Sequence, residues 1–152
     1  YLLFSQVFWS EGTQFFTVAD DRARFVDWVN FYPITNKPIL MAFYSGREQA
    51  RLEALSEAEI IAEALDVLSA IFEGVHDLFF EGIATRWGQD PFAYGSYSSY
   101  AVGSSPDDRE ALFEPLEGVL YFAGEATHLE HPATVHGAVM SGYDVAEAIL
   151  GD

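Results

Sequence analysis

The chain has 152 residues, a length that suits one domain with a sizeable hydrophobic core. Half of the residues are hydrophobic and 16% are aromatic, which excludes intrinsic disorder, and the lack of cysteine excludes disulfides and cysteine-ligated zinc. With 7 Lys and Arg against 24 Asp and Glu, the formal net charge is −17, which disfavours nucleic acid as a partner and favours cations.

The charge has a second explanation, the solubility of an acidic cytoplasmic protein. No apolar run approaches the length of a membrane span, and no signal peptide is visible. We therefore expect a cytoplasmic protein with no membrane partner.

The first part of the chain predicts an antiparallel meander of strands with one buried face. Short runs rich in aromatic and β-branched residues alternate with polar or proline-containing breaks, which is typical of strands and their connections. We expect a loop at 32–38 and strands at 1–9, 15–19, 25–30 and 39–44.

Helical patterns follow these strands. A short helix is expected near 47–55, and Ser56 with Glu59 has the spacing of a capping box for a second helix. Apolar residues then recur at helical spacing and predict an amphipathic helix that ends near Gly74. Its apolar face is expected to pack on the core, and the alternative is a helix that binds a partner's groove.

The second half begins with a short strand expected at 83–86. Residues 87–100 are rich in aromatics, glycine and serine, which is typical of an irregular, rigid loop lining a pocket. Ser105 and Pro106 then open a short helix, as cap and first-turn proline.

An apolar run near the end of the chain predicts a buried strand over 119–123. Gly124 ends this strand, and Glu125 follows directly. A carboxylate at the end of a buried strand, beside the start of a helix, is an arrangement that holds a cofactor.

The expected helix begins near Ala133, where the apolar period becomes 3.6. One face of it carries Val135, Val139, Gly142, Ala146 and Ile149. Gly137 and Gly142 are poor helix formers, so their place inside a helix indicates the close approach of another group.

Two blocks of the chain match a known pattern. The first is Phe-Ala-Gly-Glu-Ala-Thr at 122–127, followed by Pro-Ala-Thr-Val-His-Gly-Ala at 132–138 and Ser-Gly at 141–142. The second is Arg-Trp-Gly-Gln-Asp-Pro-Phe-Ala-Tyr-Gly-Ser-Tyr-Ser at 86–98. In order and spacing they strongly resemble the C-terminal FAD-binding motif of the flavin-containing amine oxidases. That family includes polyamine oxidases, monoamine oxidases and lysine-specific histone demethylases.

The resemblance implies an α+β fold that is the C-terminal part of an FAD-linked amine oxidase. Residues 1–83 would be a substrate-domain portion, a mixed or antiparallel sheet with helices, and 84–152 a C-terminal FAD-binding portion with the last strand and helix of that domain. The family's N-terminal Rossmann-like unit, with its Gly-x-Gly-x-x-Gly pattern, is absent from this chain. We therefore expect the N-terminal remainder of the same protein as a partner, and an inactive isolated piece that forms a homo-oligomer.

The resemblance also implies the chemistry. The complete protein would oxidise a small-molecule amine, a polyamine or a monoamine, to an imine by hydride transfer to FAD, and oxygen would reoxidise the flavin. The helix start at Thr134 and Val135 would contact the flavin ring and stabilise its negative charge; the alternative is an ordinary helix after an ordinary loop. Glu125 would accept hydrogen bonds from the cofactor near its ribose and pyrophosphate, with the Gly124 backbone packed close. The alternative for Glu125 is a salt bridge to an arginine such as Arg86.

Four side chains of the two blocks match positions around the reacting groups of the family. Tyr97 matches one wall of an aromatic cage that steers the amine, and Thr134 occupies the opposite wall, as in the demethylase branch. Trp87 and Phe92 match positions that pack on the flavin. For each of these, a place in the ordinary core is the alternative.

The histidines at 128, 131 and 136 lack the helical spacing of a metal pair, so no metal site is expected. A general-base role for His131 competes with that of an exposed loop residue. Two other functions stay open: an amino-acid oxidase or desaturase-like flavoprotein, and a non-catalytic interaction domain that keeps the same fold. Gly-Ser-Tyr-Ser at 95–98 argues against the first.

Overall fold

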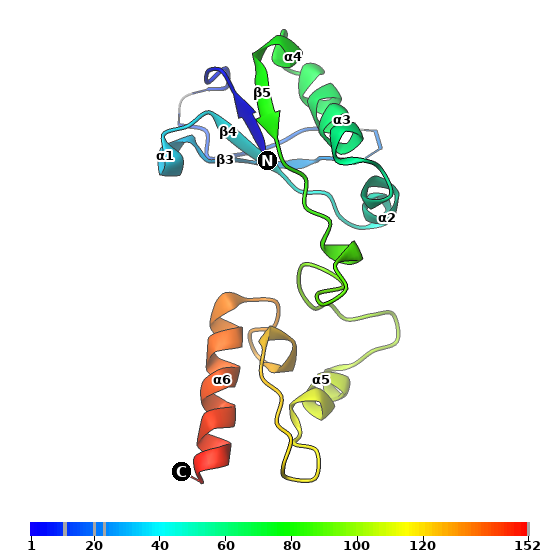
Figure 1. Ribbon diagram of the computed structural model, residues 1–152, viewed down its shortest axis with the longest axis vertical. Coiled ribbons are helices and arrows are strands. Elements are labelled where there is room, and N and C mark those ends of the chain that lie inside the picture. Colours follow the sequence, from blue (N-terminus) through cyan, green and yellow to red (C-terminus); the bar gives the residue numbers. More distant parts are fainter. Residues whose placement is uncertain (11, 20, 23, 152) are drawn as a thin grey trace. The chain divides into compact units, whose positions relative to one another are not determined.

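The computed structural model describes residues 1–10, 12–19, 21–22 and 24–151, and Figure 1 traces them. The chain forms two compact units, Tyr1–Asp90 and Pro91–Asp152. In the described ranges, no helix combines the length and the apolar character that crossing a membrane requires. The assignment of 1–83 to a substrate domain and of 84–152 to an FAD domain stays a prediction.

Unit 1 contains one antiparallel sheet with the strand order β2-β3-β4-β1-β5. Its strands are β1 (Leu2–Phe4), β2 (Phe15–Thr17), β3 (Asp27–Asn30), β4 (Ile39–Ala42) and β5 (Phe79–Gly82). The meander β2-β3-β4 is confirmed, with shorter strands than predicted. The first strand pairs with both β4 and β5, through Leu2 opposite Leu40 and Gly82.

In the described residues of unit 1, five helical segments accompany the sheet. They are α1 (Tyr32–Thr35), α2 (Arg47–Glu53), α3 (Glu57–Ser69), α4 (Val75–Leu78) and the 3₁₀ helix η1 (Trp87–Gln89). The predicted capping box is confirmed, because Ser56 Oγ accepts the Glu59 N–H at 3.3 Å and Glu59 Oε2 accepts the Ser56 N–H at 2.8 Å. The α3 helix ends at Ser69, before the predicted end near Gly74, and α1 occupies part of the predicted loop at 32–38.

The core of unit 1 lies between the sheet and the helices α2 and α3. Every second strand residue points inward, so that Leu2, Phe4, Trp28 and Leu40 are buried together with Leu52 of α2 and Leu68 of α3. Full burial of one such side chain contributes about 1.5–3 kcal/mol. Core packing, not a partner's groove, accounts for the apolar face of α3.

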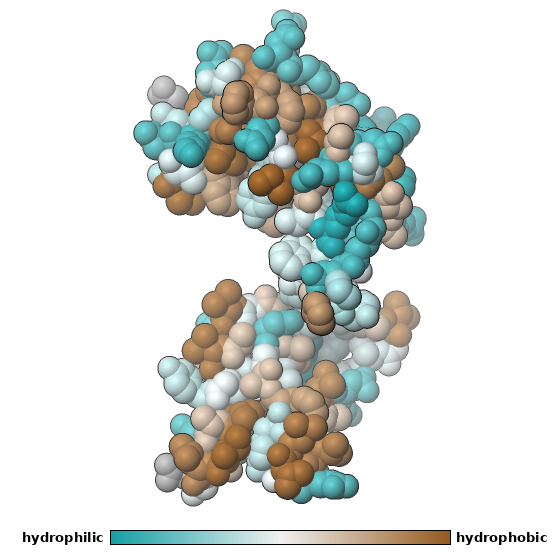
Figure 2. Space-filling view, viewed as in Figure 1, coloured by the Kyte–Doolittle hydropathy of each residue, from teal (hydrophilic) through white to brown (hydrophobic). Residues whose placement is uncertain are grey.

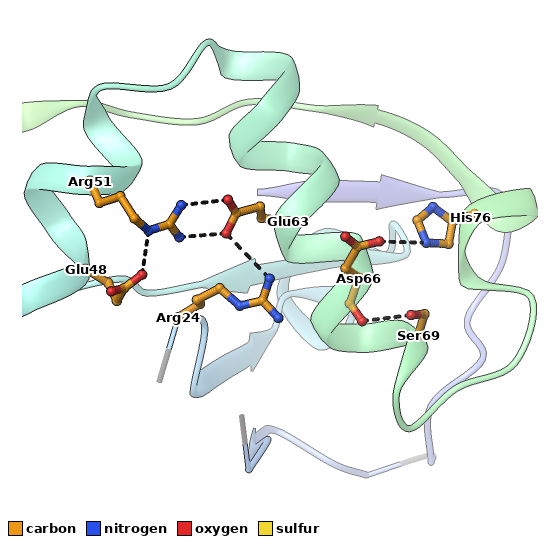
Figure 3. Close-up of polar contacts among 7 residues, drawn as sticks. All are labelled: Arg24, Glu48, Arg51, Glu63, Asp66, Ser69 and His76. Atoms are coloured by element: carbon orange, nitrogen blue, oxygen red, sulfur yellow. Dashed lines mark hydrogen bonds and ion pairs between the residues drawn. The ribbon is translucent and has the colours of Figure 1, made fainter. Parts of the chain in front are cut away.

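A charged network fastens α2 to α3 on the surface of unit 1 (Figure 3). The Arg51 guanidinium donates to both Glu63 oxygens at 2.7 Å and to Glu48 Oε2 at 2.7 Å. Arg24 adds a longer contact to Glu63 Oε2 at 3.5 Å. A forked pairing of this kind has more geometric specificity than a single ion pair.

The last strand of the sheet corrects a prediction. The sequence placed a strand at 83–86, whereas β5 covers Phe79–Gly82. Its position is set by pairing with β1, a contact between segments far apart in the chain that local patterns do not reveal.

The described part of unit 2 contains the helices α5 (Pro106–Phe113) and α6 (Val135–Leu150) and the 3₁₀ helix η2 (Glu125–Thr127). Both helix starts are confirmed. The predicted buried strand at 119–123 is wrong for this chain: Val119 is 80% exposed, and the local pairing is a single bridge between Leu116 and Leu120. A strand needs a neighbouring strand, and the described residues of unit 2 form none.

The apolar face predicted for α6 is also exposed. Val135 is 84% exposed, and Val139, Gly142, Ala146 and Ile149 are exposed as well. Hydrophobic residues are visible on the surface of this unit in Figure 2. Unit 2 therefore leaves uncovered the surfaces that the sequence marked as buried.

Candidate functional site

The Glu125 carboxylate joins three segments of unit 2. Its Oε1 accepts the Ser98 backbone N–H at 2.8 Å, and its Oε2 accepts the Ser98 hydroxyl at 2.7 Å. The Ala133 N–H donates to Oε2 at 2.6 Å. The two sequence blocks around 98 and 125 therefore meet at one side chain, together with the loop before α6.

This environment keeps Glu125 ionised. Burial, the largest single influence, raises the pKa of its carboxyl group. The hydrogen bonds from the Ser98 side chain and backbone and from the Ala133 backbone lower it, as does the charge of Arg109, and the net pKa lies below its usual value. Within unit 2, the arginine whose charge acts on Glu125 is Arg109, and the salt bridge to Arg86 that the sequence suggested stays a prediction.

Arg109 is a site residue that the sequence analysis missed. It lies on α5 and is 5% exposed. Its Nη1 donates to the Ala126 carbonyl at 2.7 Å and to Ser98 Oγ at 3.1 Å, and its Nε donates to the Tyr100 hydroxyl at 3.2 Å. One signal was available: Arg109 is the single Lys or Arg between Pro91 and Asp152, a stretch with ten Asp and Glu.

Thr134 is the N-cap of α6. Its Oγ1 accepts the Gly137 N–H at 3.0 Å and donates to the His131 carbonyl at 2.7 Å. Because the hydroxyl is engaged in this way, the methyl group is the part of the side chain that remains for a ligand. The next residue, Val135, opens the helix with an exposed side chain.

Gly124 is fixed by a buried serine of α6. Ser141 is 0% exposed, and its Oγ accepts the Gly124 N–H at 2.8 Å. Gly124 has φ of 146°, and no atom lies within 4 Å of the position that a Cβ would occupy, so its backbone is open to another group. At the start of η2, Gly124 is thus bound by Ser141 and Glu125 by Ser98.

The two glycines inside α6 differ. A Cβ on Gly137 would lie 2.0 Å from the His131 carbonyl oxygen, so the close approach predicted there is made by the chain's own loop. A Cβ on Gly142 meets no atom within 4 Å. The second glycine therefore faces open space in this structure.

A cavity of about 540 Å³ opens beside Glu125, lined by residues 93–99 together with Glu125 and Ala126. Tyr97 lines this cavity and is 67% exposed. Phe92, which directly precedes the lining segment 93–99, is 95% exposed. Neither aromatic ring is part of a core. Trp87 is in unit 1, in η1, where the neighbouring Gly88 N–H donates to Glu53 Oε1 at 3.1 Å.

The structure thus brings together five of the predicted site residues within unit 2: Tyr97, Gly124, Glu125, Thr134 and Val135. The roles assigned to them, and to Trp87 and Phe92, stay predictions.

The three histidines form a row. The His128 ring, which is buried, lies 5.4 Å from the His131 ring, and that ring lies 4.8 Å from His136. His128 Nδ1 accepts the His131 N–H at 3.0 Å. His131 is accordingly half-buried and not an exposed loop residue. In the part of the chain that the structure describes, no group of three or more acidic or histidine side chains has the arrangement to hold a metal ion.

Comparison with known proteins gives a consistent result. The model of a family described as flavin containing amine oxidoreductase matches residues 1–150. The chain is 38% identical over 158 residues to lysine-specific histone demethylase 1 homolog 1 of Arabidopsis thaliana, covering 98% of this chain and 19% of that protein. It is 38% identical over 156 residues to the Oryza sativa subsp. japonica homolog 1, covering 98% and 18%.

A further relative is the protein FLOWERING LOCUS D of Arabidopsis thaliana, 37% identical over 150 residues, which cover 93% of this chain and 19% of that protein. The chain therefore spans about one fifth of the length of these relatives.

Proposed function

Because the chain belongs to the flavin-containing amine oxidase family, whose cofactor is FAD, we propose that it is the C-terminal part of an FAD-dependent amine oxidase. In this proposal unit 1 supplies part of the substrate domain and unit 2 part of the FAD domain. The complete protein would act in the cytoplasm.

The observation that supports the proposal most is the state of Glu125. An ionised carboxylate offers about four acceptor positions. Three donors of the chain occupy three of them, one on Oε1 and two on Oε2. One acceptor position on Oε1 therefore remains for a hydroxyl group, and the ribose of FAD carries such groups. The residues present fit the cofactor.

Three further features match a flavin ring and an amine. FAD, when bound, supplies the oxidising chemistry, and the protein binds and orients it. The N-terminus of α6, at Thr134 and Val135, is the positive end of the helix dipole, which stabilises negative charge. Tyr97 presents an exposed ring beside the same cavity, which suits the approach of a cation.

The first candidate substrate is a small polyamine or monoamine. The net charge of −17 favours such cations over anionic substrates. The second candidate is an N-methylated lysine of a histone tail, favoured by the names of the relatives and by Thr134 at the cage position. The assay is designed to distinguish these candidates from three alternatives: an amino-acid oxidase, a desaturase-like flavoprotein and a non-catalytic interaction domain.

The experiment uses the complete protein, purified and examined for a flavin absorption spectrum. Hydrogen peroxide release is then measured with a polyamine, a monoamine, an N-methyl-lysine histone peptide and a panel of free amino acids. We expect turnover of one of the first three. Absence of flavin, or turnover of amino acids alone, would overturn the proposal.

One variant and its matched control test whether Tyr97 acts on the substrate and not on the cofactor, with amine turnover and flavin content measured on each. Tyr97→Ala is expected to impair amine turnover with little loss of flavin, because Tyr97 lines the cavity and its side chain makes no part of the Glu125 network. Tyr143→Ala, an exposed tyrosine on α6, serves as the control. Unchanged kinetic constants for every amine with Tyr97→Ala would remove this residue from the site.

A further inference from the structure

We infer that Arg109 is a positioning residue that holds Glu125, through Ser98, in the orientation in which its carboxylate accepts a hydrogen bond from the cofactor. The inference rests on the proposed function of the Glu125 site. It concerns a residue outside both sequence blocks, contributed by α5.

The location of Arg109 is unusual for its charge. It is the single Lys or Arg between Pro91 and Asp152, a stretch with ten acidic residues. An exposed position among those acidic residues would keep its charge hydrated and near opposite charges. It is instead 5% exposed. Burial of a guanidinium is costly unless its donors are satisfied and an opposite charge lies nearby. This position therefore has to be compensated by specific contacts.

Those contacts lead toward Glu125. The Nη1 donates to Ser98 Oγ and to the carbonyl of Ala126, the residue directly after Glu125. The Nε donates to the Tyr100 hydroxyl, and the guanidinium carbon lies 4.8 Å from the centre of the Tyr100 ring. Among the described residues, Arg109 and Glu125 form no direct ion pair, so Ser98 is the link between them.

The direction of the hydrogen bonds follows from chemistry. A guanidinium can only donate, so Ser98 Oγ accepts from Arg109, at 3.1 Å. The single hydroxyl hydrogen of Ser98 is then left for Glu125 Oε2, at 2.7 Å, while the Ser98 backbone N–H donates to Oε1. Ser98 thus contacts both oxygens and fixes the plane of the carboxylate. That plane decides where the free acceptor position on Oε1 points.

Loss of the guanidinium would leave the Ser98 hydroxyl free to rotate and would remove a favourable charge from Glu125. Arg109 itself is enclosed by protein groups and is not expected to touch the cofactor. Its effect on FAD binding should therefore exist only while Glu125 can respond to it.

A double-mutant cycle on the complete protein tests this dependence. The dissociation constant of FAD is measured by flavin fluorescence for the wild type, Arg109→Met, Glu125→Gln and the double variant. We expect Glu125→Gln and Arg109→Met each to weaken FAD binding by about 5- to 100-fold. In the Glu125→Gln background, Arg109→Met should change the constant by less than about twofold.

Rescue and control variants complete the test. Arg109→Lys keeps the charge without the forked geometry and is expected to bind FAD with intermediate affinity. Arg51→Met, which removes an arginine from the surface network of unit 1, should leave the constant unchanged. If Arg109→Met does not fold, Ser98→Ala replaces it in the same cycle, because that change removes the linking hydroxyl and keeps the backbone N–H.

The possible outcomes separate the two claims. If Arg109→Met, or Ser98→Ala in its place, weakens FAD binding equally with and without the Glu125 carboxylate, the residue supports the fold in general and the inference is wrong. If neither Arg109→Met nor Ser98→Ala weakens binding, the inference is wrong too. If Glu125→Gln alone leaves FAD binding unchanged, the proposed function of the site fails, and this inference with it.

Discussion

Tyr1–Asp90 and Pro91–Asp152 bury different kinds of side chain. Every hydrophobic residue counted as buried among the described residues, from Leu2 to Val75, belongs to unit 1. The buried side chains of unit 2 are polar: Arg109, Thr127, His128 and Ser141. Unit 1 is thus stabilised mainly by removal of apolar surface from water, and unit 2 by hydrogen bonds around one buried cation.

The difference shows that the candidate site is organised without an apolar core around it. Hydrogen bonds to charged groups contribute about 1.5–3 kcal/mol each, but part of that gain offsets the cost of removing the Arg109 guanidinium and the Glu125 carboxylate from water. The apolar side chains of unit 2, such as Val119 and Val135, lie at its surface instead. The local geometry around Glu125 is therefore well defined by polar contacts, while the free energy of folding has to come from elsewhere.

The largest expected effect comes from separating the units. A polypeptide covering Tyr1–Asp90 should unfold in one cooperative thermal transition, because it retains the whole apolar core. A polypeptide covering Pro91–Asp152 should show no cooperative transition, since none of its described residues, 91–151, belongs to a buried hydrophobic core. Circular dichroism melting of both pieces measures this. A cooperative transition in the second piece would remove the contrast.

The chain as given should neither retain FAD nor oxidise amines, and it should self-associate through the exposed apolar surface of unit 2. The glycine-rich turn that binds a dinucleotide pyrophosphate is not in this sequence. Light scattering gives the mass, and flavin fluorescence on adding FAD reports binding. A monomer that binds FAD stoichiometrically would contradict both expectations.

A smaller effect distinguishes the two glycines of α6. Gly137→Ala forces a Cβ against the His131 carbonyl and should destabilise the loop–helix contact by about 1–3 kcal/mol. Gly142→Ala has open space and should stabilise the helix by up to about 1 kcal/mol. Amide hydrogen exchange of α6 in this chain measures both. Equal loss of protection in the two variants would show that the Gly142 face is covered after all.

The smallest effect concerns carboxylates held ionised in each unit. Hydrogen bonding from Arg51 lowers the pKa of Glu63 in the folded state. The stability that the ionised Glu63 carboxylate adds is therefore fully present above its ordinary pKa of about 4.5, and it is lost as the pH falls through the lower folded-state pKa. Glu63→Gln should cost about 0.2–1 kcal/mol at neutral pH, because the pair is partly exposed. Thermal unfolding at pH 7 and at pH 3 measures it.

The pKa of Glu125 is shifted in the same direction as that of Glu63. Protonation at low pH should therefore weaken the contacts of Glu125 with Ser98 and Ala133. For Glu63, the test is the loss of stability between pH 7 and pH 3. If Glu63→Gln loses as much stability over this range as the wild type, the stabilising role of the ionised Glu63 carboxylate is contradicted.

Several features were determined by the sequence alone. The capping box at Ser56 and Glu59 and the helix starts at Pro106 and Val135 depend on groups within four residues of each other, so local patterns predict them. The blocks around 86–98 and 122–138 likewise identified the family, because their residue types stand at fixed spacings.

Only the tertiary structure decided the rest. Ser98 reaches Glu125 across 27 positions of the chain, and Arg109 reaches Ala126 across 17. Strand β5 depends on β1, and residues 119–123 form no strand because the described residues of unit 2 offer no neighbouring strand. Hydrogen bonds and strand pairs between distant segments have no local signature. For that reason the sequence indicated the carboxylate of the site, and the fold revealed the arginine that orients it.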